Sequence, residues 1–111
     1  MPAPSRLDAI RKIMELTPAD PFPRYGFAME LKNLGRLDES HQAFVELEAK
    51  SPDYVPQYLM HHNVLVALAR KPEARAVCER GIAAAGRKGD GHAQGELQQA
   101  LDALDSGEDE G

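Results

Sequence analysis

The chain repeats itself along its length, and this repeat restricts its fold more than any other feature. Pro18 and Pro52 lie 34 residues apart, and Gly86 stands at the same position one period later. Shifting the sequence by one period superposes identical side chains: Leu31 on Leu65, Leu34 on Leu68, Arg36 on Arg70 and Glu39 on Glu73. Internal periods of about 20 to 50 residues are typical of stacked units, and a unit of this length holds two helices. The period therefore predicts an all-α solenoid of helical hairpins.

Apolar spacing and helix-end signals predict about six helices and no strand. The first helix begins at Ser5, with Asp8 three residues on in an acidic variant of the capping box, and runs to about Leu16. The second begins at Asp20–Pro21 and ends at Gly35. The others are expected from about Leu37 to Ser51, around Tyr58 to Leu68, from Lys71–Pro72 to Gly86 and Gly89, and from Asp90 to Leu104.

Each helix has one apolar stripe, and these stripes are predicted to form the core. In chain order they are Leu7, Ile10, Ile13 and Met14; Phe27, Ala28, Leu31 and Leu34; Leu37, Ser40, Phe44 and Leu47; Tyr58, His61, His62, Leu65 and Leu68; Ala74, Val77, Cys78 and Ile82; Ala93, Leu97, Ala100, Leu101 and Leu104. The one-period shift aligns Ile10 with Phe44 and Ile13 with Leu47, so the first helix corresponds to the second half of a truncated repeat. We therefore expect a half repeat, two full repeats and a C-terminal capping helix.

The length of 111 residues allows one domain, which we predict over residues 1–104. The net charge of −5 comes from the C-terminal end, which holds five acidic side chains: Asp102, Asp105, Glu108, Asp109 and Glu110. Residues 105–111 are all glycine, serine or acidic residues, too polar to be buried. We therefore expect a disordered acidic tail over residues 105–111.

The repeated pattern resembles that of the tetratricopeptide repeat (TPR) family, in its short bacterial type, over roughly residues 4–104. The first full repeat matches it with Phe27, Ala28, Leu31, Gly35, Ser40, Phe44 and Pro52. The second full repeat matches it less closely, with His61, His62, Leu65, Ala69, Ala74, Cys78 and Gly86. This resemblance implies paired helices and a role in binding other proteins.

The second repeat departs from the family pattern at three positions. His62 stands where the family keeps a small residue, so either the helix pair is splayed, or the ring turns outward, or its nitrogens find partners in the interface. Cys78 replaces the aromatic Phe44, and Gly81 replaces Leu47. We expect these replacements to thin the core and make the second repeat the looser one.

The sequence contains no pattern typical of a catalytic or metal site. His61 and His62 are adjacent, so on a helix they point about 100° apart and cannot chelate one ion. Cys78, the one cysteine, stands at a core position, where an inert thiol is expected rather than a nucleophile. We therefore expect no enzyme activity, no catalytic residue, no metal and no cofactor.

The chain shows neither an apolar run long enough to span a membrane nor a secretion signal. Its single cysteine cannot form an internal disulfide, which fits a reducing compartment. A cytoplasmic location without a membrane partner is therefore expected.

Residues 70–88 carry six basic side chains against two acidic ones: Arg70, Lys71, Arg75, Arg80, Arg87 and Lys88 against Glu73 and Glu79. This excess is expected to be a solvated helix face. It could also dock an acidic segment, such as the chain's own tail. No aromatic residues are interleaved as stacking platforms, so binding of nucleic acid is not expected.

The candidate binding surface follows from solenoid geometry, in which the first helix of each pair lines the concave side. The residues beside the core stripes on these two helices are Phe22, Tyr25, Met29, Lys32 and Asn33, then Leu59, Met60, Asn63, Val66 and Ala67. The set is unusually apolar for a solvent face. Tyr and Met side chains adapt to many contacts, and Asn can bond a peptide backbone, so a groove for a peptide or protein segment is predicted.

Two other uses of the same apolar face stay open at this point. A structural homodimer could bury it, or the monomer could cover it with its own last helix. The most distant alternative is a small metal-dependent or thiol-dependent enzyme. A non-catalytic protein-binding module remains the leading interpretation.

Overall fold

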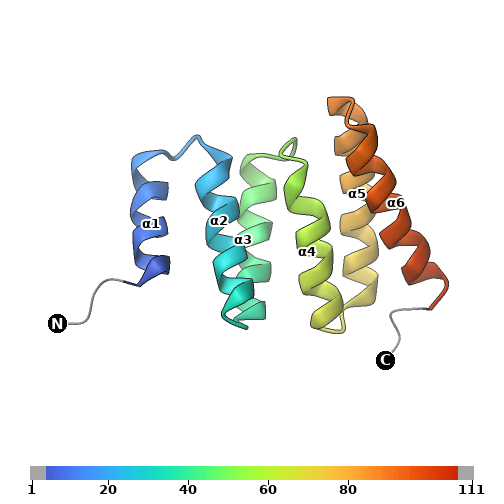
Figure 1. Cartoon of the computed structure of the whole chain (residues 1–111), viewed down its shortest axis with the longest axis horizontal. Coiled ribbons are helices and arrows are strands. Elements are labelled where there is room, and N and C mark those ends of the chain that lie inside the picture. Colours follow the sequence, from blue (N-terminus) through green and yellow to red (C-terminus); the bar gives the residue numbers. More distant parts are fainter. Residues whose placement is uncertain (1–4, 108–111) are drawn as a thin grey trace. The chain divides into compact units, whose positions relative to one another are not determined.

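The computed structural model describes residues 5–107 of the chain. This part contains six helices and no strand, as predicted (Figure 1). The helices are α1 (Arg6–Leu16), α2 (Pro21–Asn33), α3 (Leu37–Lys50), α4 (Pro56–Ala67), α5 (Lys71–Lys88) and α6 (Gly91–Asp105). The all-α helical repeat fold is thereby confirmed.

The chain divides into two compact units, residues 1–51 and residues 52–111. The first unit holds α1, α2 and α3, and the second holds α4, α5 and α6. The single domain over residues 1–104 stays a prediction. Asp105, which we assigned to the acidic tail, is the last residue of α6, whereas residues 108–111 of that tail lie outside the described residues.

In the first unit, α2 packs against both α1 and α3, and the three helices run alternately up and down (Figure 1). The predicted helix starts are confirmed, because Ser5 Oγ accepts a hydrogen bond from the Asp8 amide at 3.1 Å and Asp20 Oδ1 accepts one from the Phe22 amide at 3.0 Å. A buried hydrogen bond joins α2 and α3: Ser40 Oγ donates to the Ala28 carbonyl at 2.8 Å.

The prediction that Ile13 and Leu34 belong to the core of the first unit is wrong. Ile13 is 49% exposed, because no described helix precedes α1 to cover the face that Leu47 buries in α3. Leu34 is 54% exposed, because α2 ends at Asn33 and Leu34 forms its C-cap, so it no longer continues the apolar stripe. Burial in this unit is therefore centred on α2 and α3.

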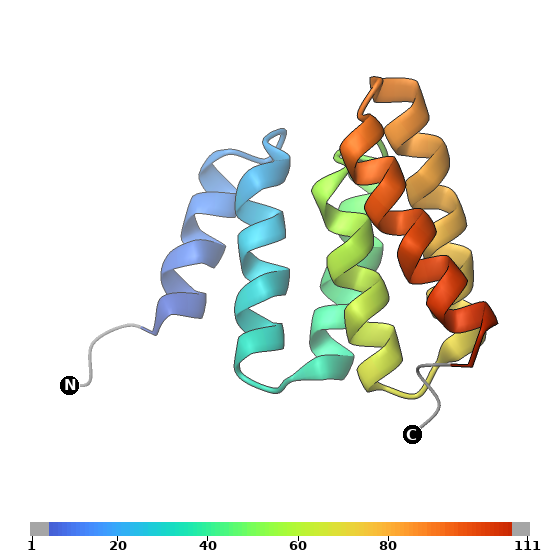
Figure 2. The ribbon, with the colours of Figure 1, turned by 45° about the vertical axis from the view of Figure 1, so that its right-hand side comes forward.

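In the second unit, α5 packs against both α4 and α6, and α4 also contacts α6 (Figure 2). One buried apolar cluster draws on all three helices and on the residue before α4: Val55, Tyr58, Leu65, Ala74, Val77, Cys78, Ala84, Ala85, Leu97 and Leu104. The predicted start of α6 is confirmed by the bond from the Ala93 amide to Asp90 Oδ1 at 3.0 Å. The capping helix thus completes the core of this unit.

The core of the second unit is filled at the position where we expected it to be thin. A Cβ atom built on Gly81 would lie 2.5 Å from Tyr58 Cβ and 2.9 Å from Leu97 Cδ1. The Tyr58 ring, only 1% exposed, therefore lies against the bare backbone of α5, and its hydroxyl donates to the Pro52 carbonyl at 2.5 Å. The aromatic volume missing from α5 is supplied by α4.

The replacement of proline by Gly86 changes the length of the helix. We expected Gly86 and Gly89 to end it, but α5 runs through Gly86 to Lys88 and has 18 residues, against 14 in α3. Glycine keeps the amide donor that proline lacks, so the helical hydrogen bonds continue through it. Gly89 ends the helix with a left-handed φ of 67°.

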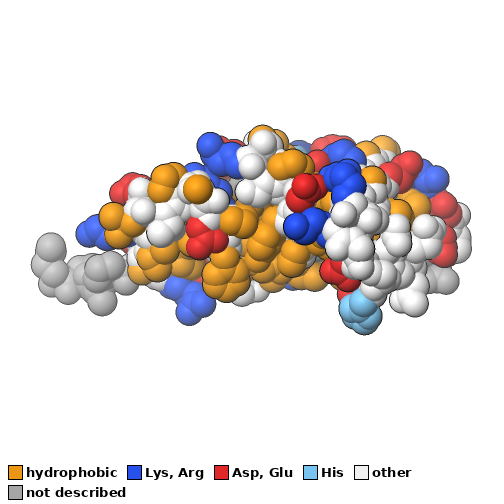
Figure 3. Space-filling model, turned by 90° about the horizontal axis from the view of Figure 1, so that it is seen from above, with side chains coloured by type: hydrophobic (Ala, Val, Ile, Leu, Met, Phe, Trp, Pro, Cys, Tyr) orange, Lys and Arg blue, Asp and Glu red, His pale blue; other side chains and the backbone are white. Residues whose placement is uncertain are grey.

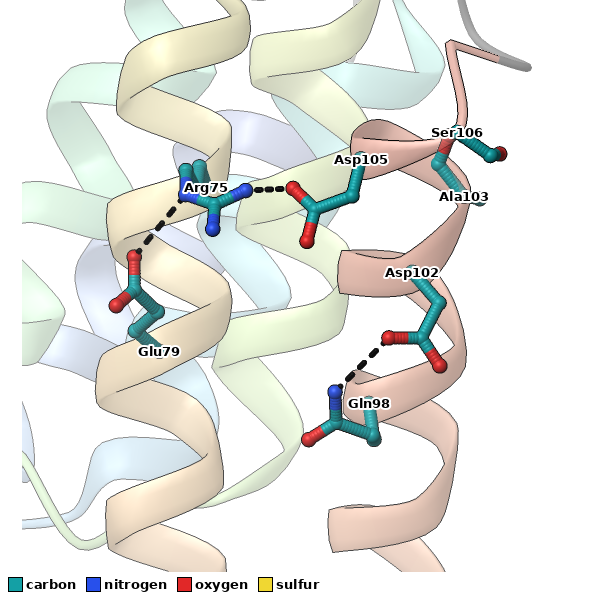
Figure 4. Close-up of polar contacts among 7 residues, drawn as sticks. All are labelled: Arg75, Glu79, Gln98, Asp102, Ala103, Asp105 and Ser106. Atoms are coloured by element: carbon teal, nitrogen blue, oxygen red, sulfur yellow. Dashed lines mark hydrogen bonds and ion pairs between the residues drawn. The ribbon is translucent and has the colours of Figure 1, made fainter.

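Ion pairs join the basic face of α5 to its surroundings within the second unit. Arg75 pairs with Asp105 at the end of α6 and, at 3.6 Å, with Glu79 on its own helix (Figure 4). Arg87 Nε donates to Asp53 Oδ1 at 2.9 Å. Part of the basic excess is therefore balanced by local carboxylates.

Candidate functional site

The first set of predicted contact residues lies on α2, and we name Phe22, Tyr25, Met29, Lys32 and Asn33 the α2 stripe. Their spacing of three and four residues places them along one side of the helix. Phe22 is 66% exposed, Asn33 is also exposed, and the three residues between them are half-buried. The stripe is aromatic at its N-terminal end and polar at its C-terminal end.

Tyr25 is held in place by the core beneath it. Its ring meets that of Phe44 on α3 edge to face, with the centroids 6.3 Å apart and an interplanar angle of 66°. Burial raises the pKa of the Tyr25 phenol above its ordinary value of 10.0. The hydroxyl therefore stays protonated at neutral pH and can donate a hydrogen bond.

The second set lies on α4, and we name Leu59, Met60, Asn63 and Val66 the α4 stripe. Leu59, Met60 and Val66 are half-buried, whereas Asn63 is exposed. Leu59 and Val66 pack against the buried cluster of the second unit, so part of their apolar surface already serves the core. Ala67, at the end of the helix, is exposed.

His62 takes a role at this stripe that the sequence did not indicate. Of the three arrangements considered for it, the outward ring is wrong, because His62 is only 5% exposed. Its Nδ1 donates to the Asn63 side-chain oxygen at 2.9 Å, while its buried Nε2 has no hydrogen-bond partner among the described residues. The ring thus orients Asn63, whose amide N–H groups can still donate to a ligand.

The structure gathers the predicted residues into two separate groups, one on a helix of each unit. Phe22, Tyr25, Met29, Lys32 and Asn33 are brought together on α2, and Leu59, Met60, Asn63 and Val66 on α4. A single groove that joins both stripes stays a prediction.

Further exposed apolar side chains, which were not among the predicted contact residues, lie in the first unit. Besides Phe22, the large exposed hydrophobic residues among those described are Ile13, Leu16, Leu34 and Val45. Figure 3 shows this unit from above, with hydrophobic side chains visible on its surface among charged ones. The sequence shows that these residues are apolar. Whether their side chains are exposed depends on which helices pack against them.

A pocket in the first unit was not foreseen. Its volume is about 350 Å³, and it is lined by Arg11, Phe27, Leu31, Asp38, Glu39, Gln42, Ala43 and Glu46. The Arg11 guanidinium lies 5.2 Å from the centroid of the Phe27 ring, a cation–π contact between α1 and α2. Arg36 pairs with Glu39 at 2.6 Å and lowers the pKa of that carboxyl. No sequence spacing could reveal this pocket, because three helices contribute to it.

The described residues contain no group of three His, Cys, Asp or Glu side chains that could hold a metal ion. Cys78 is fully buried in the second unit. Within residues 5–107, no helix is both long enough and apolar enough to cross a membrane.

Comparisons with known proteins agree with the helical pairs. No family model and no curated protein matches the chain. A solution NMR structure of a tetratricopeptide repeat domain protein from Salinibacter ruber matches with a TM-score of 0.75 and 30% sequence identity, covering 78% of this chain and 88% of that one. A crystal structure of a tetratricopeptide repeat domain protein from the same organism matches with a TM-score of 0.73 and 30% identity, covering 78% of this chain and 97% of that one.

Proposed function

Because the chain belongs to the tetratricopeptide repeat family, we propose that it is a non-catalytic module for protein–protein interaction. In this proposal the ligand is a peptide or protein segment held in a concave groove. The contact residues are those of the α2 stripe and the α4 stripe. The family supports a protein partner in general, and the exposed side chains of α2 support the particular surface.

The exposure of Phe22 is the observation that carries this proposal. α2 already has a packed neighbour on two sides, α1 and α3, and yet Phe22 is 66% exposed. Met29 lies further along the same side and is half-buried. Aromatic and Met side chains are enriched at the centres of protein interfaces, where they are removed from water on binding. An exposed Phe next to a fixed Tyr25 ring offers such a centre.

The polar residues of both stripes suit the backbone of a bound segment. Asn33 and Asn63 are exposed, and the His62 ring fixes the Asn63 side chain. A preoriented amide loses less conformational entropy on binding than a free one. The proposed ligand therefore contributes apolar side chains to the aromatic end of α2 and backbone groups to the asparagines.

A protein partner also fits the charges better than nucleic acid. The basic side chains of α5 are partly occupied, since Arg75 pairs with Glu79 and Asp105, and Arg87 with Asp53. We propose that this module is non-catalytic. The burial of the Cys78 thiol and the lack of a candidate metal cluster among the described residues are consistent with this proposal. We place its action in the cytoplasm, in keeping with the single cysteine.

Selection from a displayed library of short peptides on the immobilised chain tests this function. We expect enriched peptides whose affinity falls about tenfold or more in Met29→Glu and in Met60→Glu, because each substitution puts a charge into a contact that must lose water. The matched control is Val45→Glu, which places the same charge at a 43% exposed apolar residue of α3 outside both stripes.

Circular dichroism establishes that each variant keeps its helices. If no peptide is enriched, or if Met29→Glu and Met60→Glu bind like the Val45→Glu control, the proposed surface is wrong.

The second candidate is a homodimer that buries the same two stripes. Exposed Phe22 would be covered equally well by a second copy of the chain. In that case Met29→Glu converts a dimer into a monomer in sedimentation, and the selection finds no peptide that binds the wild-type dimer.

A further inference from the structure

α1 leaves exposed an apolar position that is buried in α3, the corresponding helix of the next pair. Ile13 holds the repeat position of Leu47, and it is 49% exposed where Leu47 is 0% exposed. Leu47 lies on α3, the second helix of a pair whose first helix is α2, whereas no described helix precedes α1. Ala9 and Leu16 are also exposed and lie four and three residues from Ile13 along the same side. We name Ala9, Ile13 and Leu16 the α1 stripe.

The last helix of another copy does not suit this face. α6 is the first helix of an incomplete pair, so it could formally complete the half repeat that begins with α1. The one-period shift from His61, His62 and Leu65 leads to Gly95, Glu96 and Gln99, and all three are exposed. A polar outer face is typical of a helix that terminates a solenoid. Head-to-tail stacking would therefore leave the α1 stripe against polar side chains.

The charges beside the α1 stripe fit a second α1. Lys12 and Glu15 lie on one flank of the stripe, they have opposite signs, and they stand on either side of Ile13 along the chain. Both are exposed and neither forms an ion pair within the described residues. When two copies cross in opposite directions at Ile13, Lys12 of each copy lies near Glu15 of the other.

The other flank does not oppose this pairing. Arg6, its charged residue, is already paired with Glu30 of α2 at 3.2 Å. We propose that the α1 stripe is the interface of a two-fold symmetric homodimer, in which the α1 helices of two copies pack antiparallel. A single helix of 11 residues is short, so the dimer is weak and forms in the micromolar range or above.

Sedimentation equilibrium of the full chain over a range of concentrations measures this association. We expect a rise from the mass of one chain to that of two, and a loss of this rise in Ile13→Asp. Lys12→Glu and Glu15→Lys, each alone, turn two attractive pairs into two repulsive ones and weaken the dimer about tenfold at low salt. The control Gln99→Lys changes an exposed residue of α6 and leaves the association unchanged.

Mixing the two charge variants gives the decisive result. Combining Lys12→Glu in one copy with Glu15→Lys in the other restores both attractive pairs, so native mass spectrometry with one isotope-labelled variant should find the heterodimer favoured over either homodimer. The proposal is overturned if the wild-type chain remains a monomer at the highest concentrations. It is also overturned if Ile13→Asp dimerises like the wild type, or if the mixture shows no preference for the heterodimer. A dimer through the α2 and α4 stripes gives a different pattern, because Met29→Glu would disrupt it whereas Ile13→Asp and the charge variants of α1 would not.

Discussion

The two units of the molecule treat their large apolar side chains differently. Every large exposed hydrophobic residue among those described lies in the first unit, and the buried apolar cluster that includes Tyr58 and Leu97 lies in the second. The first unit contains the repeat that matches the family pattern more closely, and the second contains the repeat that departs from it. Agreement with a repeat pattern therefore does not measure how completely a unit buries its apolar residues.

The two units differ in which helix contributes the large side chains that fill the core between paired helices. In the first pair, α3 contributes Phe44 and Leu47, both fully buried, and α2 contributes the small Ala28. In the second pair, α5 contributes Cys78 and Gly81, and α4 contributes the large Tyr58. The large side chains of α3 are replaced by small ones in α5, and the Tyr58 ring of α4 takes up the space beside Gly81. This exchange, together with the extra contacts of α6, closes the second unit.

The largest expected effect tests this exchange directly at Gly81. Gly81→Ala should lower the free energy of unfolding by about 3 kcal/mol, because the added Cβ would lie 2.5 Å from Tyr58 Cβ and the α4 and α5 backbones must separate. Urea denaturation measures the change. Gly95→Ala is the matched control in α6, where nothing lies within 4 Å of the added Cβ, and it should raise stability by about 0.5 to 1 kcal/mol.

Equal effects at both glycines would show that Tyr58 does not rely on the bare backbone of α5.

A smaller effect is expected where His62 replaces the small Ala28. His62→Leu should raise the free energy of unfolding by about 1 kcal/mol, because it removes a buried Nε2 without a partner and leaves no cavity. Thermal and urea denaturation both report this gain. The control His92→Leu changes a side chain that is 88% exposed and should alter stability by less than about 0.5 kcal/mol.

A loss of stability in His62→Leu would mean that the bond from Nδ1 to Asn63 stabilises the fold by more than the unpartnered Nε2 destabilises it.

The smallest effect is expected at the turns between the paired helices, where both units have the same backbone. Gly35 has a φ of 75°, and Ala69, one period later, has a φ of 59°. The left-handed region suits glycine and strains alanine. Ala69→Gly should therefore raise stability by about 0.5 kcal/mol, after the higher entropy of glycine in the unfolded chain, and Gly35→Ala should lower it by about 1 kcal/mol.

Denaturation of the two variants side by side checks the signs. Opposite signs support one shared turn geometry, and a gain in both variants would contradict it.

The fold was largely predictable from local signals. Ser5, Asp20 and Asp90 each carry a capping oxygen that bonds the amide two or three residues on, so the starts of α1, α2 and α6 follow from short-range chemistry. The end of α5 was predicted less well, because Gly86 permits a helix that a proline at the same position would stop. A proline therefore predicts the end of a helix more reliably than a glycine does, because glycine permits a helix to end or to continue.

The candidate site was predictable only in part. The spacing of Phe22, Tyr25 and Met29 along α2 follows from helix geometry, and the sequence indicated it. The bond from His62 to Asn63 and the contact of Arg11 with Phe27 were not foreseen. A side chain's hydrogen-bond partner depends on its rotamer and on neighbouring elements, neither of which appears in a periodic pattern.

The sequence by itself determined the period, the number of helices and the position of each in a helical pair, because these depend on side-chain spacing and on residues at helix ends. Only the tertiary structure decided which apolar residues are covered. Ile13 and Leu47 hold the same position of the repeat, and one is half exposed while the other is buried, because a helix packs against the second and none described packs against the first. Burial is a property of the partners that a residue meets, and those partners come from distant parts of the chain or from another molecule.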